Sequence, residues 1–120
     1  MRFIQEYGFT VKVGQVVAHQ KWLIENHDAL VRSQPKGTRY IGTFVVVLSS
    51  EKNAGAYRAI YEIDGYGAMD VQASDAKDPD SVSAKLTAEW SAFWDTDLSA
   101  PWSNALLKNV VDATIFDPKS

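Results

Sequence analysis

Two polar side chains, Gln20 and His27, occupy positions where the sequence predicts a buried helix face, and they are the first candidates for chemistry. At about 100° per residue along a helix, both project near the centre of an apolar arc, beside Leu23 and Ile24. Burying either one without a partner would cost about 1–3 kcal/mol, so each needs a hydrogen bond. Two interpretations stay open: a core histidine bonded to a strand, or a small-molecule pocket in which His27 acts as general base and Gln20 orients the ligand.

Aromatic residues could form the walls of such a pocket. Trp90, Phe93 and Trp94 recur at helical spacing, and Tyr57 and Tyr61 alternate along a strand. Aromatic stripes with this spacing usually just pack in a core, which is the favoured alternative. If a ligand does bind, Trp90, Trp94, Tyr57 and Tyr61 are the residues expected to contact it.

His19 lies toward the rim of the same arc and is a further candidate for ligand contact. It is eight residues from His27, which does not match the i,i+4 spacing of zinc-binding histidines, and no carboxylate completes a ligand set. The sequence also contains no cysteine, no G-x-S-x-G elbow, no phosphate loop and no dinucleotide fingerprint. Neither a metal nor a bound cofactor is therefore expected.

The elements that would position these residues follow from the hydrophobic pattern. Residues 3–13 alternate as a half-buried strand, and residues 15–34 follow a helical pattern that Pro35-Lys36-Gly37 terminates. The predicted buried arc of this helix consists of six residues: Val16, Val17, Leu23, Ile24, Leu30 and Val31. Residues 38–49 and 56–64 are predicted strands of a hairpin.

The second half of the chain adds helices and a last strand. Asp64 is a candidate cap for a short helix over residues 66–73, and Asp78-Pro79 favours the start of another helix. The latter helix carries an apolar stripe of Val82, Leu86, Trp90, Phe93 and Trp94. Residues 104–116 are predicted to form a strand with apolar odd positions, among them Leu107, Val111, Ala113 and Ile115.

This order of elements predicts an α+β fold. The simplest packing is a ferredoxin-like βαββαβ sandwich, in which helices cover one face of a four-stranded antiparallel sheet. A chain of 120 residues is long enough for one such domain, so residues 1–120 are expected to form a single unit.

Composition narrows the classes of partner. The chain is 46% hydrophobic and 22% charged with a formal net charge of −3, and we expect no nucleic-acid partner because phosphate binding needs a basic face. The apolar run Phe44–Leu48 is far shorter than the roughly 20 residues of a membrane span, and no signal peptide is recognisable. We therefore expect a soluble, cytoplasmic protein without a membrane partner, since the absence of cysteine fits a reducing compartment.

The same run, Phe44–Leu48, predicts a homodimer. It places apolar side chains on both faces of its strand, whereas helices of one chain cover only one face. A second sheet from an identical subunit would cover the other. Charged residues at even positions of the remaining strands leave two alternatives for that face, a solvated surface with cross-strand ion pairs or a polar dimer interface.

One local pattern resembles a known superfamily. Residues 57–70, YRAIYEIDGYGAMD, are similar to the third strand and following helical turn in the dimeric α/β-barrel superfamily of ferredoxin-like proteins. Its branches include NIPSNAP-like, EthD-like and antibiotic-biosynthesis monooxygenase-like proteins. The resemblance covers nearly the whole chain and implies a dimer with a pocket between the sheet and helices of each subunit. Two hypotheses about function remain. The chain binds or transforms a small apolar or aromatic metabolite without metal or cofactor, or it is a non-catalytic dimer with a filled core.

Overall fold

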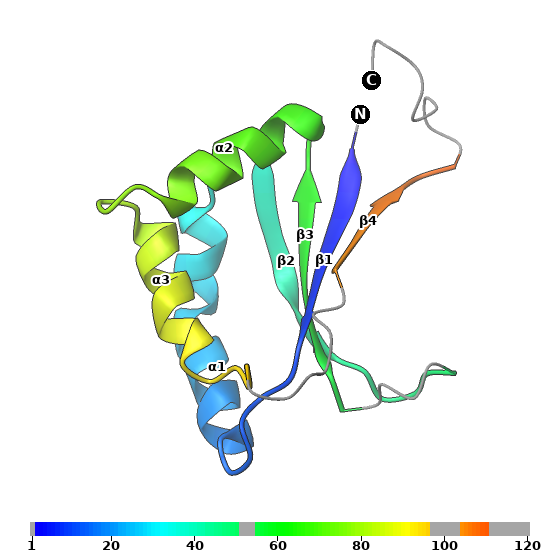
Figure 1. The fold of residues 1–120 in the computed structure, drawn as a ribbon, viewed down its shortest axis with the longest axis vertical. Helices are drawn as coiled ribbons and strands as arrows, with labels where there is room; N and C mark the ends of the chain where they lie inside the picture. The colour runs from blue at the N-terminus through cyan, green and yellow to red at the C-terminus, as the bar shows by residue number, and fades with distance from the viewer. Residues whose placement is uncertain (1, 51–54, 97–103, 111–120) are drawn as a thin grey trace.

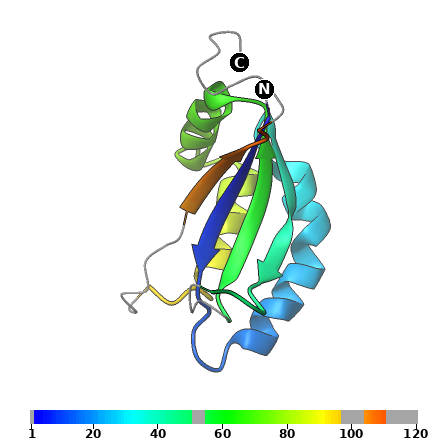
Figure 2. The same cartoon turned by 90° about the vertical axis from the view of Figure 1, so that its right-hand side faces the viewer.

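The computed structural model describes residues 2–50, 55–96 and 104–110. Its elements follow in the order β1 (Phe3–Phe9), α1 (Val16–Ser33), β2 (Thr38–Val45), β3 (Tyr57–Ile63), α2 (Tyr66–Ala76), α3 (Val82–Ser91) and β4 (Asn104–Lys108). The helices lie together on one side of the sheet, and the other face is open (Figures 1 and 2). No helix in the described part of the chain is long and apolar enough to cross a membrane.

The four strands form one antiparallel sheet in the order β2-β3-β1-β4. Phe3 pairs with Ile63 of β3 and Lys108 of β4, so the edge strand β4 joins the first strand of the chain. This topology and the one-sided helical layer confirm the predicted α+β ferredoxin-like fold.

Side-chain alternation assigns each strand residue to one face. Phe3, Gln5 and Phe9 of β1 are buried against the helices, as are Ala59 and Ile63 of β3. Two buried clusters result. The larger consists of Phe9, Leu30, Tyr40, Ala59, Leu86 and Trp90, and the smaller of Phe3, Ile63 and Ala68.

The predicted buried arc of α1 is confirmed at Leu30 and wrong at most of its other positions. His19 and Leu30 are buried, whereas Val17 is 79% exposed and Ile24 is 71% exposed. Gln20 and His27, which were predicted near the centre of that arc, are exposed as well. The helix carries two apolar stripes, and the one containing Leu30 and the partly buried Leu23 faces the sheet.

Two predicted helix caps are also wrong. Helix α3 begins at Val82 rather than at Asp78-Pro79, because the Ser81 hydroxyl accepts a hydrogen bond from the Ala84 amide at 3.0 Å. Asp78 instead accepts from the amide of Asp80 in the preceding turn, at 2.9 Å. Helix α2 has no side-chain cap, since its N-cap is Gly65.

Strands β1, β2 and β4 end earlier than predicted, and β2 stops at Val45. β1 stops at Phe9, and Val11 forms only an isolated bridge with Trp94 before the chain turns at Gly14, whose φ is +82°. β4 ends at Lys108, and residues 111–116 lie outside the described part. Leu107, one of the apolar odd positions of this strand, pairs with Ile4 on the open face.

The open face of the sheet combines apolar side chains with ion pairs. Arg39 binds Glu62 at 2.7 Å and Asp64 at 2.8 Å, and Arg58 lies 3.5 Å from Glu6. The apolar residues on or beside this face include Phe44 and Leu107, which are 54% and 48% exposed. The apolar run Phe44–Leu48 was predicted to lie within one strand, but β2 ends at Val45. Val47 and Leu48 lie beyond the strand and are exposed as well.

Candidate functional site

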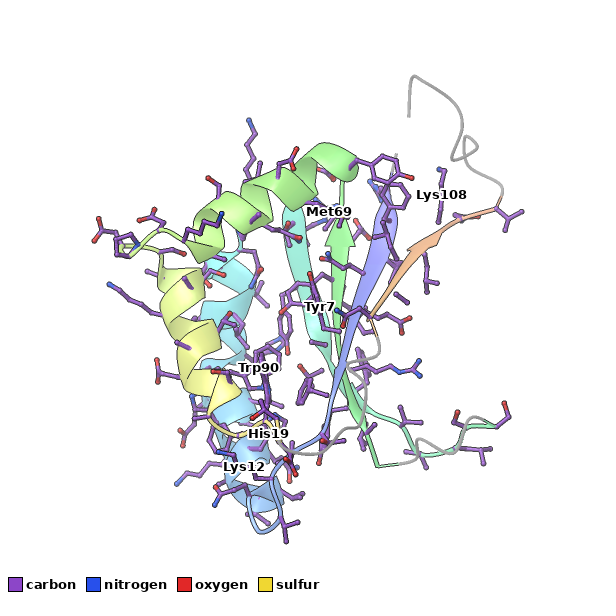
Figure 3. All side chains as sticks on the ribbon, viewed as in Figure 1. Tyr7, Lys12, His19, Met69, Trp90 and Lys108 are labelled. Atoms are coloured by element: carbon purple, nitrogen blue, oxygen red, sulfur yellow. The ribbon has the colours of Figure 1, made fainter. Side chains whose placement is uncertain are left out.

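A cavity of about 350 Å³ lies between the sheet and the helices. Strands β1 and β3 form one wall, helices α2 and α3 form the opposite wall, and the connection from α1 to β2 contributes to the rim. Its lining residues are Gln5, Tyr7, Phe9, Gln34, Pro35, Ala59, Tyr61, Gln72, Asp75, Ala76, Ser83, Ala84, Thr87, Trp90 and Trp94. Figure 3 shows the side chains of Tyr7 and Trp90 in the space between the two layers.

Large aromatic rings close one end of this cavity. Trp90 is fully buried on α3, and its ring lies 5.6 Å from that of Phe9 and 5.4 Å from that of Trp94. Trp94 follows the helix and is fixed by its bridge to Val11 beyond β1. Aromatic pairs at these separations stabilise each other by about 0.5–1.5 kcal/mol beyond their burial. This end of the cavity is therefore a firm apolar wall.

Two phenol groups line the side formed by the sheet. The rings of Tyr7 and Tyr61 meet edge to face at 5.7 Å, and Tyr40 lies 5.5 Å beyond Tyr61. Burial raises the pKa of Tyr7, Tyr40 and Tyr61 above that of a free tyrosine, because the phenolate would lose its hydration. All three phenols are thus neutral hydrogen-bonding groups near neutral pH.

The phenols differ in their partners. The Tyr40 hydroxyl shares a hydrogen bond of 2.6 Å with the Thr43 hydroxyl. The Tyr61 hydroxyl makes no hydrogen bond to any residue that the structure describes. A phenol without a protein partner at a cavity wall is available to donate to a bound molecule.

A pair of amide side chains joins α2 to the sheet at the other end. Gln5 and Gln72 exchange two hydrogen bonds of 3.2 and 2.9 Å, and Gln72 also donates to the Thr38 hydroxyl at 3.0 Å. Gln5 is only 5% exposed. These polar groups satisfy one another, so they hold the helix over the sheet rather than offer free donors to a ligand.

His19 supports the aromatic wall from behind. Its Nε2 accepts a hydrogen bond of 2.9 Å from the Trp90 indole, so the proton of the neutral ring is on Nδ1. The ring is 1% exposed and lies 5.0 Å from that of Tyr57 and 5.7 Å from that of Phe93. Burial lowers the pKa of His19. His19 therefore fixes the orientation of Trp90 but does not line the cavity.

The structure gathers only some of the residues that the sequence singled out. Trp90, Trp94 and Tyr61 line the cavity together. Tyr57 instead stacks on Phe9, with ring centroids 5.7 Å apart.

Gln20 and His27 lie on the exposed side of α1 and are absent from the cavity lining. The ring of His27 reaches only that of Tyr40, at 5.8 Å. The predicted geometry for a general base at this position is therefore wrong, since His27 does not face the cavity.

Sequence reasoning missed Gln5, Tyr7 and Gln72 as site residues. Gln5 has the same parity as Phe3 and Phe9 in β1, so a polar residue on the buried side of a strand was a signal in the sequence. Gln72 gave no such signal, because its partner is 67 residues away along the chain. Among the described residues, no group of three or more His, Cys, Asp or Glu could hold a metal ion.

The chain is an α+β sandwich in which helices cover one face of the sheet. Several solved structures have the same fold. A NIPSNAP family protein from Agrobacterium tumefaciens is 14% identical, with a TM-score of 0.61 and 98% of each chain covered. A NIPSNAP domain protein from Burkholderia xenovorans is 12% identical, with a TM-score of 0.63 over 93% of this chain and 98% of its own.

A third solved structure also shares the fold. It is a protein from Nitrosomonas europaea named for the antibiotic biosynthesis monooxygenases, 8% identical with a TM-score of 0.54 over 94% of each chain. At these identities the similarity establishes the fold, and it confirms the ferredoxin-like architecture that the NIPSNAP-like and monooxygenase-like resemblance implied. No family model matches the sequence, and no curated protein matches it.

Proposed function

We propose that the cavity binds an uncharged small molecule, largely apolar or aromatic, without a metal or a bound cofactor. The observation that carries this proposal is the composition of its walls. Trp90, Trp94 and Phe9 supply apolar surface, and a volume of about 350 Å³ lies within the range of small-molecule sites. Among the lining residues that the structure describes there is no lysine, arginine or histidine. An anionic ligand would lose its hydration here without meeting a positive charge.

The polar groups of the cavity favour a ligand with a hydrogen-bond acceptor. Tyr61 has a free hydroxyl, and the raised pKa of both Tyr61 and Tyr7 keeps them protonated as donors. The carboxylate of Asp75 already accepts from the Ser81 hydroxyl at 2.8 Å. A carbonyl or ether oxygen facing Tyr61 would fit this arrangement. Binding is better supported than proton-transfer catalysis, because phenols with a raised pKa are poor bases near neutral pH.

A ligand screen with a cavity-filling variant tests this proposal. We would screen small neutral metabolites by thermal shift and retest each ligand on Ala84→Leu, which places a larger side chain in the cavity. Ala88→Leu is the matched control, because Ala88 is exposed on the same helix and does not line the cavity. We expect Ala84→Leu to lose binding and Ala88→Leu and His27→Ala to keep it. A screen without any hit, or a ligand that still binds Ala84→Leu with wild-type affinity, would overturn the proposal.

We further propose that a second copy of the chain covers the open face of the sheet. Phe44 is 54% exposed on this face and Leu107, which pairs with Ile4, is 48% exposed, and a second sheet packed on this face would cover both. The side chains of Arg58 and Glu6, which are 30% and 17% exposed, form an ion pair within each subunit. They could therefore lie in a polar part of this interface without losing their partner.

The mass in solution tests the sheet-face dimer. Ile60 lies at the centre of the open face, opposite Glu6 in the β1–β3 pairing. We expect Ile60→Glu to break the sheet-face contact and so lower the mass measured by light scattering, and Ala88→Glu on the outer surface of α3 to leave it unchanged. A wild type that remains monomeric at high concentration would exclude the sheet-face dimer.

A further inference from the structure

Helix α1 presents a second apolar stripe to solvent, on the side away from the sheet. We call Val17, Ile24 and Val31 the outer stripe; they are 79%, 71% and 45% exposed. Their spacing of seven residues is nearly two full helical turns, so the three side chains align along the helix. Ile24 follows the buried His19 by five residues and therefore projects about 140° away from it.

The outer stripe has the character of a helix–helix seam. β-Branched residues repeated every seven positions are typical of the contact line between two paired helices. An isolated apolar side chain on a surface needs no explanation, but three aligned ones along an 18-residue helix form a continuous strip. Nothing in the described part of the chain covers this strip, since its residues remain exposed in the folded subunit.

We propose that the outer stripe binds α1 of a second copy of this chain, with the two helices antiparallel about a two-fold axis at Ile24. Val17 and Val31 lie seven residues before and after Ile24, so the stripe is symmetric about its own centre. A two-fold axis therefore places Ile24 against Ile24 of the partner subunit and Val17 against Val31 of the partner subunit. Such a contact is isologous, the commonest kind in homo-oligomers.

The charges beside the stripe select the antiparallel arrangement. Lys21 and Asp28 lie on the same flank, three residues before and four after Ile24. In the antiparallel pair, Lys21 and Asp28 of the partner subunit differ in height along the helix axis by the rise of about one residue. The two-fold axis generates the same contact a second time, so two equivalent Lys–Asp ion pairs form. In a parallel pair the two-fold axis would run along the helices, so Lys21 and Asp28 would face Gln20 and His27 of the partner subunit and neither ion pair would form.

The opposite flank is self-complementary as well. Gln20 and His27 lie four residues before and three after Ile24, and both are exposed. The same two-fold axis brings each His27 beside Gln20 of the partner subunit, where an imidazole and an amide can form a hydrogen bond. The two polar residues that the sequence placed on an apolar arc thus gain a role at an interface between helices.

The α1 contact is independent of the proposed sheet-face dimer. Helix α1 lies on the side of the sheet away from the open face (Figures 1 and 2), and the outer stripe is on the exposed side of this helix, so one subunit can use both contacts at once. We expect the two contacts together to give an assembly larger than a dimer. Ile60→Glu, which targets the sheet face, should leave the α1 contact intact.

Single cysteines test the register directly, because the chain has no cysteine of its own. Under mild oxidation Ile24→Cys should form a disulfide with its own copy. Val17→Cys mixed with Val31→Cys should give mainly the mixed disulfide. Glu89→Cys, on the exposed side of α3, is the control for random collision and should cross-link no more than that background. Equal cross-linking of Ile24→Cys and Glu89→Cys, or a preference of Val17→Cys for itself, would overturn the proposal.

A charge exchange tests the selection of the antiparallel pair. We expect Lys21→Asp to weaken the α1 association about tenfold in sedimentation experiments, since it sets two carboxylates together. The double variant Lys21→Asp/Asp28→Lys should restore it, whereas Lys85→Asp on α3 should have no effect. Circular dichroism would verify that each variant keeps its helices. Failure of the double variant to recover association would refute the proposed pairing.

Discussion

Lowering the pH from 7 to 5.5 should destabilise the folded chain through one buried imidazole, that of His19. Its Nε2 accepts the hydrogen bond of the Trp90 indole at 2.9 Å, and its Nδ1 has no partner among the described residues. The indole can only donate, so a second proton on Nε2 would break this bond and leave a buried cation. Burial accordingly lowers the pKa of His19 in the folded state.

The sign and size of the effect follow from proton linkage. The unfolded chain binds a proton on His19 at a pKa of about 6.5, while the folded chain does so only at lower pH. Between these two values the unfolded state holds more protons, so the free energy of unfolding falls as the pH falls. If the ring stays neutral in the fold throughout, the loss between pH 7 and pH 5.5 is at most about 1.3 kcal/mol.

Urea denaturation at a series of pH values measures this loss. The reference is His19→Gln, whose amide oxygen can accept the Trp90 hydrogen bond but does not titrate, so its pH dependence over the same range should be flatter. His27→Gln is the matched control, because His27 is exposed and its replacement should leave the wild-type slope unchanged. Asp64 does not interfere, since Arg39 lowers the pKa of its carboxyl group and it titrates below this range. Parallel profiles for wild type and His19→Gln would refute the reasoning.

Three further substitutions test the supports of the fold by chemical denaturation. Ser81→Ala removes the N-cap bond of α3 and should cost about 1 kcal/mol; an unchanged midpoint would show that the cap is replaced by water. Gln72→Leu leaves the buried amide of Gln5 without its partner and should cost about 1–3 kcal/mol, and a neutral result would contradict the proposed role of the amide pair. Gly37→Ala should cost more than Gly14→Ala, because both have a positive φ but only at Gly37 would a Cβ lie 3.3 Å from a side chain of α2.

The order of elements could be read from the sequence because each segment has a distinct period. The alternation around Phe3 and Phe9 specifies β1, and the Pro35-Lys36-Gly37 terminator specifies the end of α1 to within a residue or two. The predicted element boundaries are wrong where two sequence signals compete. Asp78 and Ser81 are both good N-caps, and only the geometry of the turn between α2 and α3 decides for Ser81.

The orientation of α1 could not be deduced from the pattern, and the physical reason is that two apolar stripes lie about a third of a turn apart. One contains Leu23 and Leu30, the other Ile24 and Val31, and a single arc drawn through both has its centre between them. That centre is where Gln20 and His27 fall, which is why their burial was predicted. Which stripe faces the sheet depends on tertiary packing, in particular on the fit of His19 behind Trp90.

The candidate site was predictable only in its large residues. Trp90, Trp94 and Tyr61 gave a signal because big aromatic side chains rarely lie far from a core. The empty volume itself comes from small residues, which give no signal: Ala59 on β3 and Ala84 on α3 both line the cavity. The gap between the sheet and the helices lies between the aromatic rings at one end and the Gln5–Gln72 amide pair at the other, and these groups hold the two layers apart.

Filling the gap between the layers should therefore separate stability from function. Ala84→Leu adds apolar contacts to an unfilled space, so we expect it to raise the melting temperature if the new side chain fits without strain. The same change should abolish ligand binding if the volume is functional. A stabilised variant that loses every ligand of the wild type would show that the chain keeps this cavity open at the expense of stability. A protein of this fold whose only requirement was a packed core would gain stability from filling the cavity.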